Sequence, residues 1–325
     1  MQEILSLAGA NLISPIILSF ALGLAAALAR SDLTIPEAVA KGMSIYLLFA
    51  IGFKGGVAVS THGIDQTLIL SLIAGLVLSF GLPLIAFAML RFMTGLSNID
   101  AAAVAAHYGS ISIVTFVAAT SVLQGRMISS EGYMVAVAAV MEAPAILSAL
   151  WLVARSGGGG KMEPGLMREL LLNGSIVLLV GAFFIGAITG EKGLDEISPF
   201  IVAPFKGVLC LFLLDMGLIA GRGLRQSRGV VSMGAVGFAI AMPLIGAAIG
   251  LGAGLLVGLS LGGVVLMMVL SASASYIAVP AAMRVALPEA NPSVYLTLSL
   301  GVTFPFNLTL GIPLYLAIAQ IAVGV

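Results

Sequence analysis

Long apolar runs, separated by short polar loops, are the feature that most constrains this chain. About ten runs of roughly 20 apolar residues follow one another, and a helix of that length spans the hydrocarbon core of a bilayer. Of the 325 residues, 60% are hydrophobic and only 9% are charged, whereas about 25% of an average soluble domain is charged. The sequence therefore predicts an all-α polytopic membrane protein with about ten transmembrane helices.

The predicted spans form two groups of five. They lie near residues 12–29, 38–59, 67–92, 99–123, 133–154, 170–189, 199–220, 230–256, 262–283 and 294–323. A glycine-rich polar linker at residues 155–168 separates the groups, and a stretch of this composition behaves as a flexible connection. We therefore expect a first unit at residues 1–154 and a second unit at residues 169–325.

Four short patterns occur in both halves in the same order. They are Lys41-Gly42 with Gly52 and Gly56 against Lys206-Gly207 with Gly217 and Gly221, Pro83-Leu84-Ile85 against Pro243-Leu244-Ile245, Ser110 and Ser112 against Ser273 and Ser275, and Pro144 against Pro305. Self-similarity of this kind indicates an internal repeat. Because each repeat has an odd number of spans, the second repeat is inverted in the membrane, which predicts a 5+5 inverted repeat.

The basic residues predict the orientation of the chain. Ten of the 14 Lys and Arg residues lie in the loops after the odd-numbered spans. The other four are Lys54, Arg126, Lys192 and Lys206. The positive-inside rule places the odd loops in the cytoplasm and both termini outside. The net charge of zero gives no reason to expect a nucleic-acid partner.

Two serine motifs inside apolar runs predict helices that break in mid-membrane. The candidate substrate-binding residues are Gly109, Ser110, Ile111 and Ser112 in the first half and Ser271, Ala272, Ser273 and Ser275 in the second. Two broken helices in corresponding positions are typical of a transporter binding site. The alternative is that these small residues only allow close helix packing.

Broken helices also indicate what kind of ligand could bind. The N-terminal end of a helix carries a partial positive charge and unpaired N–H groups, and the C-terminal end carries the opposite charge and unpaired carbonyls. No Lys or Arg lies within either motif. A bound anion would therefore depend on helix dipoles, hydroxyls and a co-bound cation, which favours a small monoanion moved together with Na⁺.

The candidate Na⁺ ligands are hard oxygen donors near these breaks. They are Ser110, Glu142, Ser273, Thr303 and Asn307. A carboxylate such as that of Glu142 in the middle of a span is costly and by default functional, although it could instead be a structural hydrogen-bond partner. Inter-helix hydrogen bonding is the alternative for Asn307. We expect no organic cofactor.

Four other residues allow more than one interpretation. Lys54 lies close enough to a span end to extend its ammonium to the membrane surface. Asp215 could pair at a helix or subunit contact or belong to an ion path. His107 could line the site or titrate, or it could be a packed neutral histidine. We interpret Cys210, the one cysteine, as a packing residue.

Several stretches of the chain resemble the sodium-dependent bicarbonate transporter family best known from cyanobacteria. These are Met141-Glu142-Ala143-Pro144-Ala145-Ile146, Ser273-Ala274-Ser275-Tyr276-Ile277, Leu287-Pro288-Glu289-Ala290-Asn291-Pro292-Ser293, Thr303-Phe304-Pro305-Phe306-Asn307 and Gly311-Ile312-Pro313. The likeness covers nearly the whole chain, and its C-terminal stretches are the most specific.

The resemblance implies a ten-span inverted repeat with a core and a gate domain, forming a homotrimer in a bacterial cytoplasmic (inner) membrane. It implies Na⁺-coupled bicarbonate uptake at two crossing broken helices lined by the serines of both motifs. Members of the family are regulated by a small PII-like protein on the cytoplasmic face. The short linker at 155–168 departs from their longer cytoplasmic segment, which puts that partner in doubt here.

The leading hypothesis is therefore a Na⁺-coupled symporter that imports a small monoanion, bicarbonate first among the candidates, by alternating access. A sodium–proton antiporter using Glu142, or an organic-anion symporter, is the nearest alternative. A passive channel is a further one. An intramembrane serine hydrolase, with Ser110 as nucleophile and His107 one helical turn away, is the alternative from another class.

Overall fold

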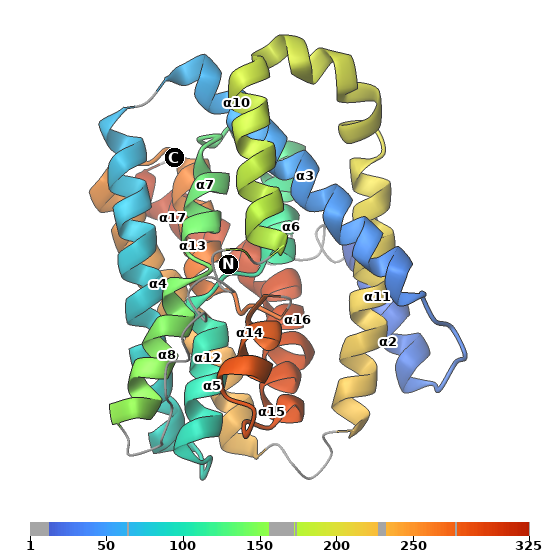
Figure 1. The fold of residues 1–325 in the computed structure, drawn as a ribbon, viewed down its shortest axis with the longest axis vertical. Helices are drawn as coiled ribbons and strands as arrows, with labels where there is room; N and C mark the ends of the chain where they lie inside the picture. Colours follow the sequence, from blue (N-terminus) through green and yellow to red (C-terminus); the bar gives the residue numbers. More distant parts are fainter. Residues whose placement is uncertain are drawn as a thin grey trace.

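The computed structural model describes residues 13–63, 65–155, 172, 174–226, 232–276 and 278–324, and within these residues it contains helices and no strands. In chain order the helices are α2 (Pro15–Leu28), α3 (Glu37–His62), α4 (Gln66–Met93), α5 (Asn98–Gly109), α6 (Ile113–Gly125), α7 (Met134–Val140), α8 (Pro144–Arg155), α10 (Gly174–Ile201), α11 (Phe205–Gln226), α12 (Met233–Val257), α13 (Leu261–Ala272), α14 (Ala278–Ala286), α15 (Pro292–Leu296), the π-helical segment η1 (Thr297–Thr303), α16 (Phe304–Phe306), the π-helical segment η2 (Asn307–Gly311) and α17 (Ile312–Val323) (Figure 1).

The predicted membrane class is confirmed. In the part of the chain that the structure describes, eight helical segments are long and apolar enough to cross a bilayer, and α2 and α13 are shorter apolar helices. Each predicted span therefore contains an apolar helix. Many large apolar side chains on these helices face outward, as expected for surfaces that contact lipid.

The helices form two packed groups (Figure 1). The four-helix unit consists of α2, α3, α10 and α11, in which α10 packs on α3 and α11 packs on α2. The crossing unit contains the remaining helices, with α4 packed on α5, α13 on α12, and α12 on α4. In the four-helix unit, α2 and α3 of the first half correspond to α10 and α11 of the second half. Exchanging the halves therefore converts the α10–α3 pair into the α2–α11 pair. This pattern supports an inverted repeat; the boundaries at 154 and 169 stay predictions, and the linker after Arg155 lies outside the described residues.

The repeated glycines lie where helices of the four-helix unit approach most closely. A Cβ added at Gly56 of α3 would overlap the backbone carbonyl of Phe183 in α10. A Cβ added at Gly217 of α11 would overlap the carbonyl of Phe20 in α2. Small residues at a fixed spacing let backbones touch in a membrane, where dispersion contacts replace the hydrophobic effect. The two glycine patterns therefore have equivalent roles in the two halves.

The predicted boundary between the sixth and seventh spans is wrong. Helix α10 does not end at residue 189 but turns at Gly190, which has φ +59° and ψ −153°, and continues to Ile201. The seventh span begins at Phe205 rather than at Pro199. Glycine permits this bend because it has no Cβ. Beyond the bend, Ile201 packs against a small apolar cluster on α3.

The last span of each half is irregular at its proline. The fifth span is interrupted between α7 and α8 just before Pro144, which has no N–H to continue the helix. In the tenth span, two π-helical segments flank Pro305. Wide helical turns of this type are rare and occur often at functional sites.

A substitution in α11 tests the packing of the four-helix unit. Gly217→Ala should reduce stability by about 1–3 kcal/mol, because a methyl group would force α2 and α11 apart. Gly207→Ala on the same helix has no atom within 4 Å of the added Cβ and should leave the thermal midpoint unchanged or slightly raised. Thermal unfolding of the purified variants in detergent measures both. Equal midpoints would contradict the close contact.

Candidate functional site at two broken helices

The two predicted breaks are present and have nearly the same local geometry. Helices α5 and α13 are both 12 residues long and begin at a capping serine. Each ends at a serine in extended conformation, Ser110 with φ −88° and ψ 161° and Ser273 with φ −85° and ψ 163°. The chain resumes as helix at Ile113 and at Ala278. The serine motifs therefore interrupt a helix in each half, as predicted.

The two breaks bond directly to each other. The N–H of Ser112 donates to Oγ of Ser273 at 2.9 Å, and the N–H of Ser275 donates to the carbonyl of His107 at 2.7 Å. The Ser273 hydroxyl in turn donates to the carbonyl of Leu270 at 3.0 Å. Each break thus supplies partners for backbone groups that the other leaves without helical bonds. A break in one half depends on the break in the other.

The contacts at the crossing are not symmetric. If the two halves were equivalent, the N–H of Ser275 would donate to Oγ of Ser110, the counterpart of Ser273. It donates instead to the carbonyl of His107. The Ser110 hydroxyl is completely buried and has no hydrogen-bond partner among the residues that the structure describes. A buried hydroxyl without a partner is costly, which makes this atom the leading candidate for a ligand contact.

Two other serines hold the helices that restart after the breaks. Oγ of Ser112 accepts from the N–H and from the hydroxyl of Thr115, at 3.2 and 2.9 Å. Oγ of Ser275 accepts from the N–H of Val279 at 3.4 Å. These caps fix the N-terminal ends of α6 and α14 at the crossing, where their partial positive charges favour an anion.

The remaining candidate residues of the two motifs have different positions. A Cβ at Gly109 would overlap the ring of Pro83, so glycine allows α5 to contact α4 there. Ile111 lies buried between the two parts of the first broken helix. The Ala272 carbonyl accepts from the Asn307 amide at 2.8 Å. The Ser271 hydroxyl is also buried without a partner among the described residues, but it faces Gly250 of α12 rather than the Ser112–Ser273 contact.

Two of the predicted Na⁺ ligands connect the tenth span to the breaks. The Thr303 hydroxyl donates to the Ala239 carbonyl at 2.6 Å and lies 2.7 Å from the hydroxyl of Tyr108, which precedes the first break. Oδ1 of Asn307 accepts from Tyr315 at 2.8 Å, and its amide reaches the second break. Each of these oxygens keeps a lone pair that can accept a further contact.

Glu142 lies at the interruption of the fifth span. Its side chain is 5% exposed, and Oε2 has no hydrogen-bond partner in the described part of the chain. The neighbouring Met141 carbonyl accepts from the Ser79 hydroxyl of α4 at 2.6 Å. The bond from Thr303 to Ala239 of α12 joins the corresponding spans of the second half, with the donor on the opposite span. Glu142 is therefore a buried carboxyl group at the interruption of the fifth span, and no described hydrogen bond connects it to the serines of the two breaks.

The geometry of His107 does not favour the hydrolase alternative. Nδ1 lies 2.6 Å from the Ala103 carbonyl, and the ring stacks on Tyr295 at 4.6 Å. Nε2 and the Ser110 hydroxyl are both buried and without partners, so the two do not form the hydrogen bond that a nucleophile and its base require. At the crossing, His107 contributes its backbone carbonyl, which accepts from the N–H of Ser275, and the sequence does not reveal this contact.

The available donors suit an alkali cation better than a transition metal. In the described ranges, no group of three or more His, Cys, Asp or Glu side chains could hold a metal ion. Near the crossing the donors are hydroxyl, amide and backbone oxygens, and oxygen ligands of this kind suit hard cations.

The comparison with protein families identifies the chain. The family model of the Na⁺-dependent bicarbonate transporter superfamily matches residues 15–320, which include both breaks and the irregular tenth span. The chain belongs to this family. A comparison with curated proteins gave no match. The resemblance noted from the motifs is thus confirmed, and the chain is a multi-pass membrane protein of a transporter family.

Two serine substitutions test the hydrogen bonds at the crossing. Ser273→Ala should lower stability by about 1–3 kcal/mol, because it leaves the buried N–H of Ser112 without an acceptor. Ser110→Ala removes a hydroxyl that has no partner and should not lower stability. Thermal unfolding in detergent, without Na⁺ or bicarbonate, compares the two variants. The assignment fails if Ser110→Ala proves the more destabilising.

Proposed function

We propose that this protein is a Na⁺-coupled secondary active symporter that imports a small monoanion, bicarbonate, by alternating access. Membership of the Na⁺-dependent bicarbonate transporter superfamily supports the ion and the substrate. The observation that carries the mechanism is the pairing of the two broken helices with a buried, unpartnered Ser110 hydroxyl beside it. The site has polar groups to offer a ligand and no charged side chain of its own within the serine motifs.

Bicarbonate matches these groups chemically. Its two charged oxygens accept from the Ser110 hydroxyl and from N–H groups at the starts of α6 and α14, while its own hydroxyl donates to a carbonyl at the end of α5 or α13. Gly109, Ile111 and Ala272 contribute backbone atoms, and the remaining contacts come from Ser112, Ser273 and Ser275. Ser271 faces Gly250 and has no contact in this proposal.

In this proposal, Na⁺ binds beside the anion and is coordinated by backbone carbonyls at the helix ends. The hydroxyls of Ser110, Ser273 and Thr303 and the side-chain oxygen of Asn307 are the nearest additional donors. Glu142 adds a carboxylate that balances the charge of the cation. Because opposite charges attract strongly in a site of low dielectric constant, each ion should raise the affinity for the other.

Alternating access follows from the asymmetry of the crossing. In the other state of an inverted repeat, the two halves exchange their contacts. The N–H of Ser275 would then donate to Ser110, and the N–H of Ser112 to the Leu270 carbonyl. The two states differ by a change of hydrogen-bond partners at the breaks, and the ligand is released from the groups that become paired.

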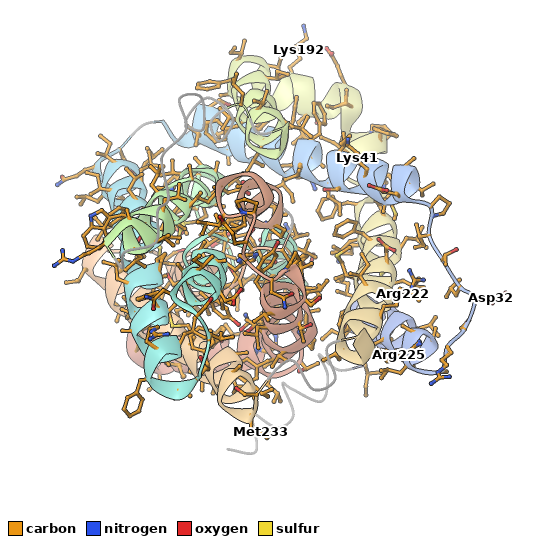
Figure 2. The ribbon with its side chains drawn as sticks, turned by 60° about the horizontal axis from the view of Figure 1, so that its bottom comes forward. Asp32, Lys41, Lys192, Arg222, Arg225 and Met233 are labelled. Atoms are coloured by element: carbon orange, nitrogen blue, oxygen red, sulfur yellow. The ribbon has the colours of Figure 1, made fainter. Side chains whose placement is uncertain are left out.

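We also propose the membrane orientation and assembly. Arg222 and Arg225 lie beside the segment that holds Asp32, away from Lys192 (Figure 2). There Arg222 and Arg225 donate to the carbonyls of Leu33 and Ala27, at 2.9 and 2.8 Å. The positive-inside rule assigns this segment to the cytoplasm and both termini to the outside of a bacterial inner membrane. The homotrimer remains an inference from family resemblance.

Sodium–proton exchange is the second candidate, and Glu142 is the observation that favours it. A buried membrane carboxyl whose Oε2 has no partner can exchange a proton for Na⁺. Exchange needs no anion. Proton movement driven by a Na⁺ gradient without bicarbonate, and lost in Glu142→Gln, would replace the symport proposal.

Uptake of radiolabelled bicarbonate into proteoliposomes tests the proposal. An inward Na⁺ gradient should drive concentrative uptake, and Ser110→Ala should reduce its rate about tenfold or more, since a hydrogen bond to a charged group contributes about 1.5–3 kcal/mol. Ser148→Ala is the matched control, because this serine is also buried and unpartnered but lies in α8, outside both serine motifs. Uptake that ignores the Na⁺ gradient would contradict symport. Equal rates for the two variants would remove Ser110 from the site.

A further inference from the structure

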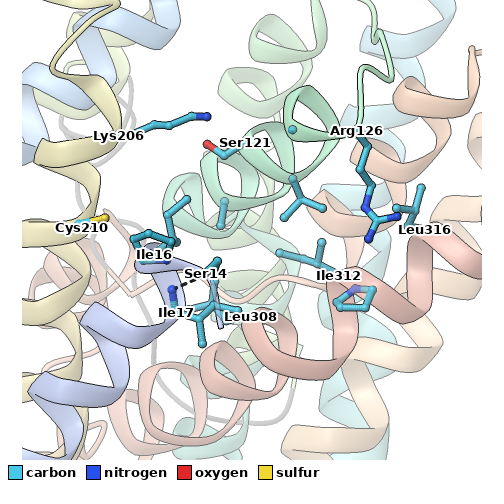
Figure 3. A pocket seen from close by; sticks show the side chains of 15 residues that line it. Ser14, Ile16, Ile17, Ser121, Arg126, Lys206, Cys210, Leu308, Ile312 and Leu316 are labelled. Carbon is cyan, nitrogen blue, oxygen red and sulfur yellow. Dashed lines mark hydrogen bonds between the residues drawn. The ribbon is translucent and has the colours of Figure 1, made fainter. Parts of the chain in front are cut away.

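A cavity of about 450 Å³ lies between the four-helix unit and the crossing unit (Figure 3). The start of α2 and the start of α11 form one wall, and the last turns of α6 with η2 and α17 form the other. The crossing is at the opposite end of α6, at its first residue. The cavity is therefore on the side of the membrane that holds Arg126 and the end of α6.

The charged groups of this cavity are all positive. Arg126 and Lys206 line it, and no Asp or Glu does. Both side chains are solvent-exposed, and among the described residues neither has a carboxylate partner in an ion pair. Lys206 extends toward Ser121 in the close view (Figure 3). The N-terminal ends of α2 and α11 lie in the same wall and add partial positive charge.

The same face of α6 leads from this cavity toward the first break. A second cavity of about 220 Å³ shares Ser121 with the first and is lined by Lys54, whose ammonium lies 4.7 Å from the ring centre of Phe205. A third of about 10 Å³ shares Val117 with the second and includes Ile113, the residue after Ser112. That volume holds about one water molecule. Along α6, the cavities thus become smaller toward the crossing.

One acidic residue, Glu131, lines the second cavity, and its carboxylate already accepts two hydrogen bonds. Glu131 accepts from the N–H and the hydroxyl of Ser260 at the start of α13, at 2.6 and 3.0 Å. Lys54 and Glu131 do not form an ion pair in the described contacts. Of the four basic residues that the sequence assigns to this side, only Lys192 lines neither cavity.

We propose that the 450 Å³ cavity is an anion-collecting vestibule, in which Lys206 and Arg126 concentrate the monoanionic substrate before it moves along α6 to the crossing. This rests on the proposed function for the identity of the substrate. The two serine motifs contain no Lys or Arg, and in this proposal the positive side chains lie at the entrance instead. A capture site of exposed cations favours anions over neutral solutes and weakens with salt.

Cys210 allows the potential in the cavity to be measured without transport. It is the chain's one cysteine, lies one turn after Lys206, lines the same cavity and is partly exposed. Its thiolate attacks a methanethiosulfonate reagent, forming a disulfide and releasing sulfinate. The rate ratio of an anionic to a cationic reagent of similar size, divided by the ratio for a free small thiol, reports the local charge. Cys210→Ser is the background control.

The wild-type ratio should exceed that of the free thiol and should fall with salt. Lys206→Gln should lower it by about three- to tenfold, because it removes a charge one helical turn from the thiol. Arg126→Gln should lower it less, because Arg126 lies on the opposite wall of the cavity (Figure 3). Lys192→Gln is the matched control: it removes an exposed charge of the same sign that does not line the cavity, and the ratio should not change. If neither Lys206→Gln nor Arg126→Gln changes the rate ratio, the vestibule proposal is wrong.

Uptake kinetics separate this inference from the proposed function. If both hold, Lys206→Gln raises the KM for bicarbonate several-fold at low salt and leaves the maximal rate unchanged. If the wild-type protein takes up no bicarbonate but Cys210 still prefers the anionic reagent, the proposed substrate is wrong and the vestibule is supported. An unchanged KM in Lys206→Gln, with normal wild-type uptake, contradicts a role in capture.

Discussion

The need to pair every backbone polar group inside a bilayer governs this structure. A helix that stops in mid-membrane leaves N–H and carbonyl groups that water cannot reach. Here each interrupted helix supplies hydrogen-bond partners for backbone groups of the other, through the contacts of Ser112 with Ser273 and of Ser275 with His107. The proline-containing helices α4 and α12 pack against these segments and against each other. The crossing is therefore possible only as a pair, within a scaffold that brings the two halves together.

Much of this arrangement could be predicted from the sequence because the membrane leaves few alternatives. Serines at alternate positions in an apolar run indicated breaks that the structure has at Ser110 and Ser273. Repeated glycines indicated an internal repeat, and Gly56 and Gly217 make close helix contacts in the two halves. The turn at Gly190 was missed because the charged residues that follow it look like an ordinary loop. The interruption of the fifth span falls at Pro144, which the sequence marked only as one of two repeated prolines.

The details of the site depend on tertiary contacts that no local pattern encodes. Whether Ser275 bonds to the hydroxyl of Ser110 or to the carbonyl of His107 is decided by how the two broken helices cross. The same applies to Ser271, whose side chain faces α12 and not the other break. In our proposal, the unequal bonding of two equivalent serines gives the transporter its two states. In the same proposal, the charged side chains of Lys206 and Arg126 lie at the vestibule, and helix dipoles supply the partial charges at the crossing.

The most direct test of the account is whether Na⁺ and bicarbonate bind the purified protein cooperatively. Titration calorimetry of each ion, without and with a saturating concentration of the other, measures the coupling. If the two ions share the crossing, Na⁺ should tighten bicarbonate binding by about tenfold, and bicarbonate should tighten Na⁺ binding by the same factor, since linkage is reciprocal. Affinities for each ion that do not depend on the other would contradict a shared site and, with it, the proposed mechanism.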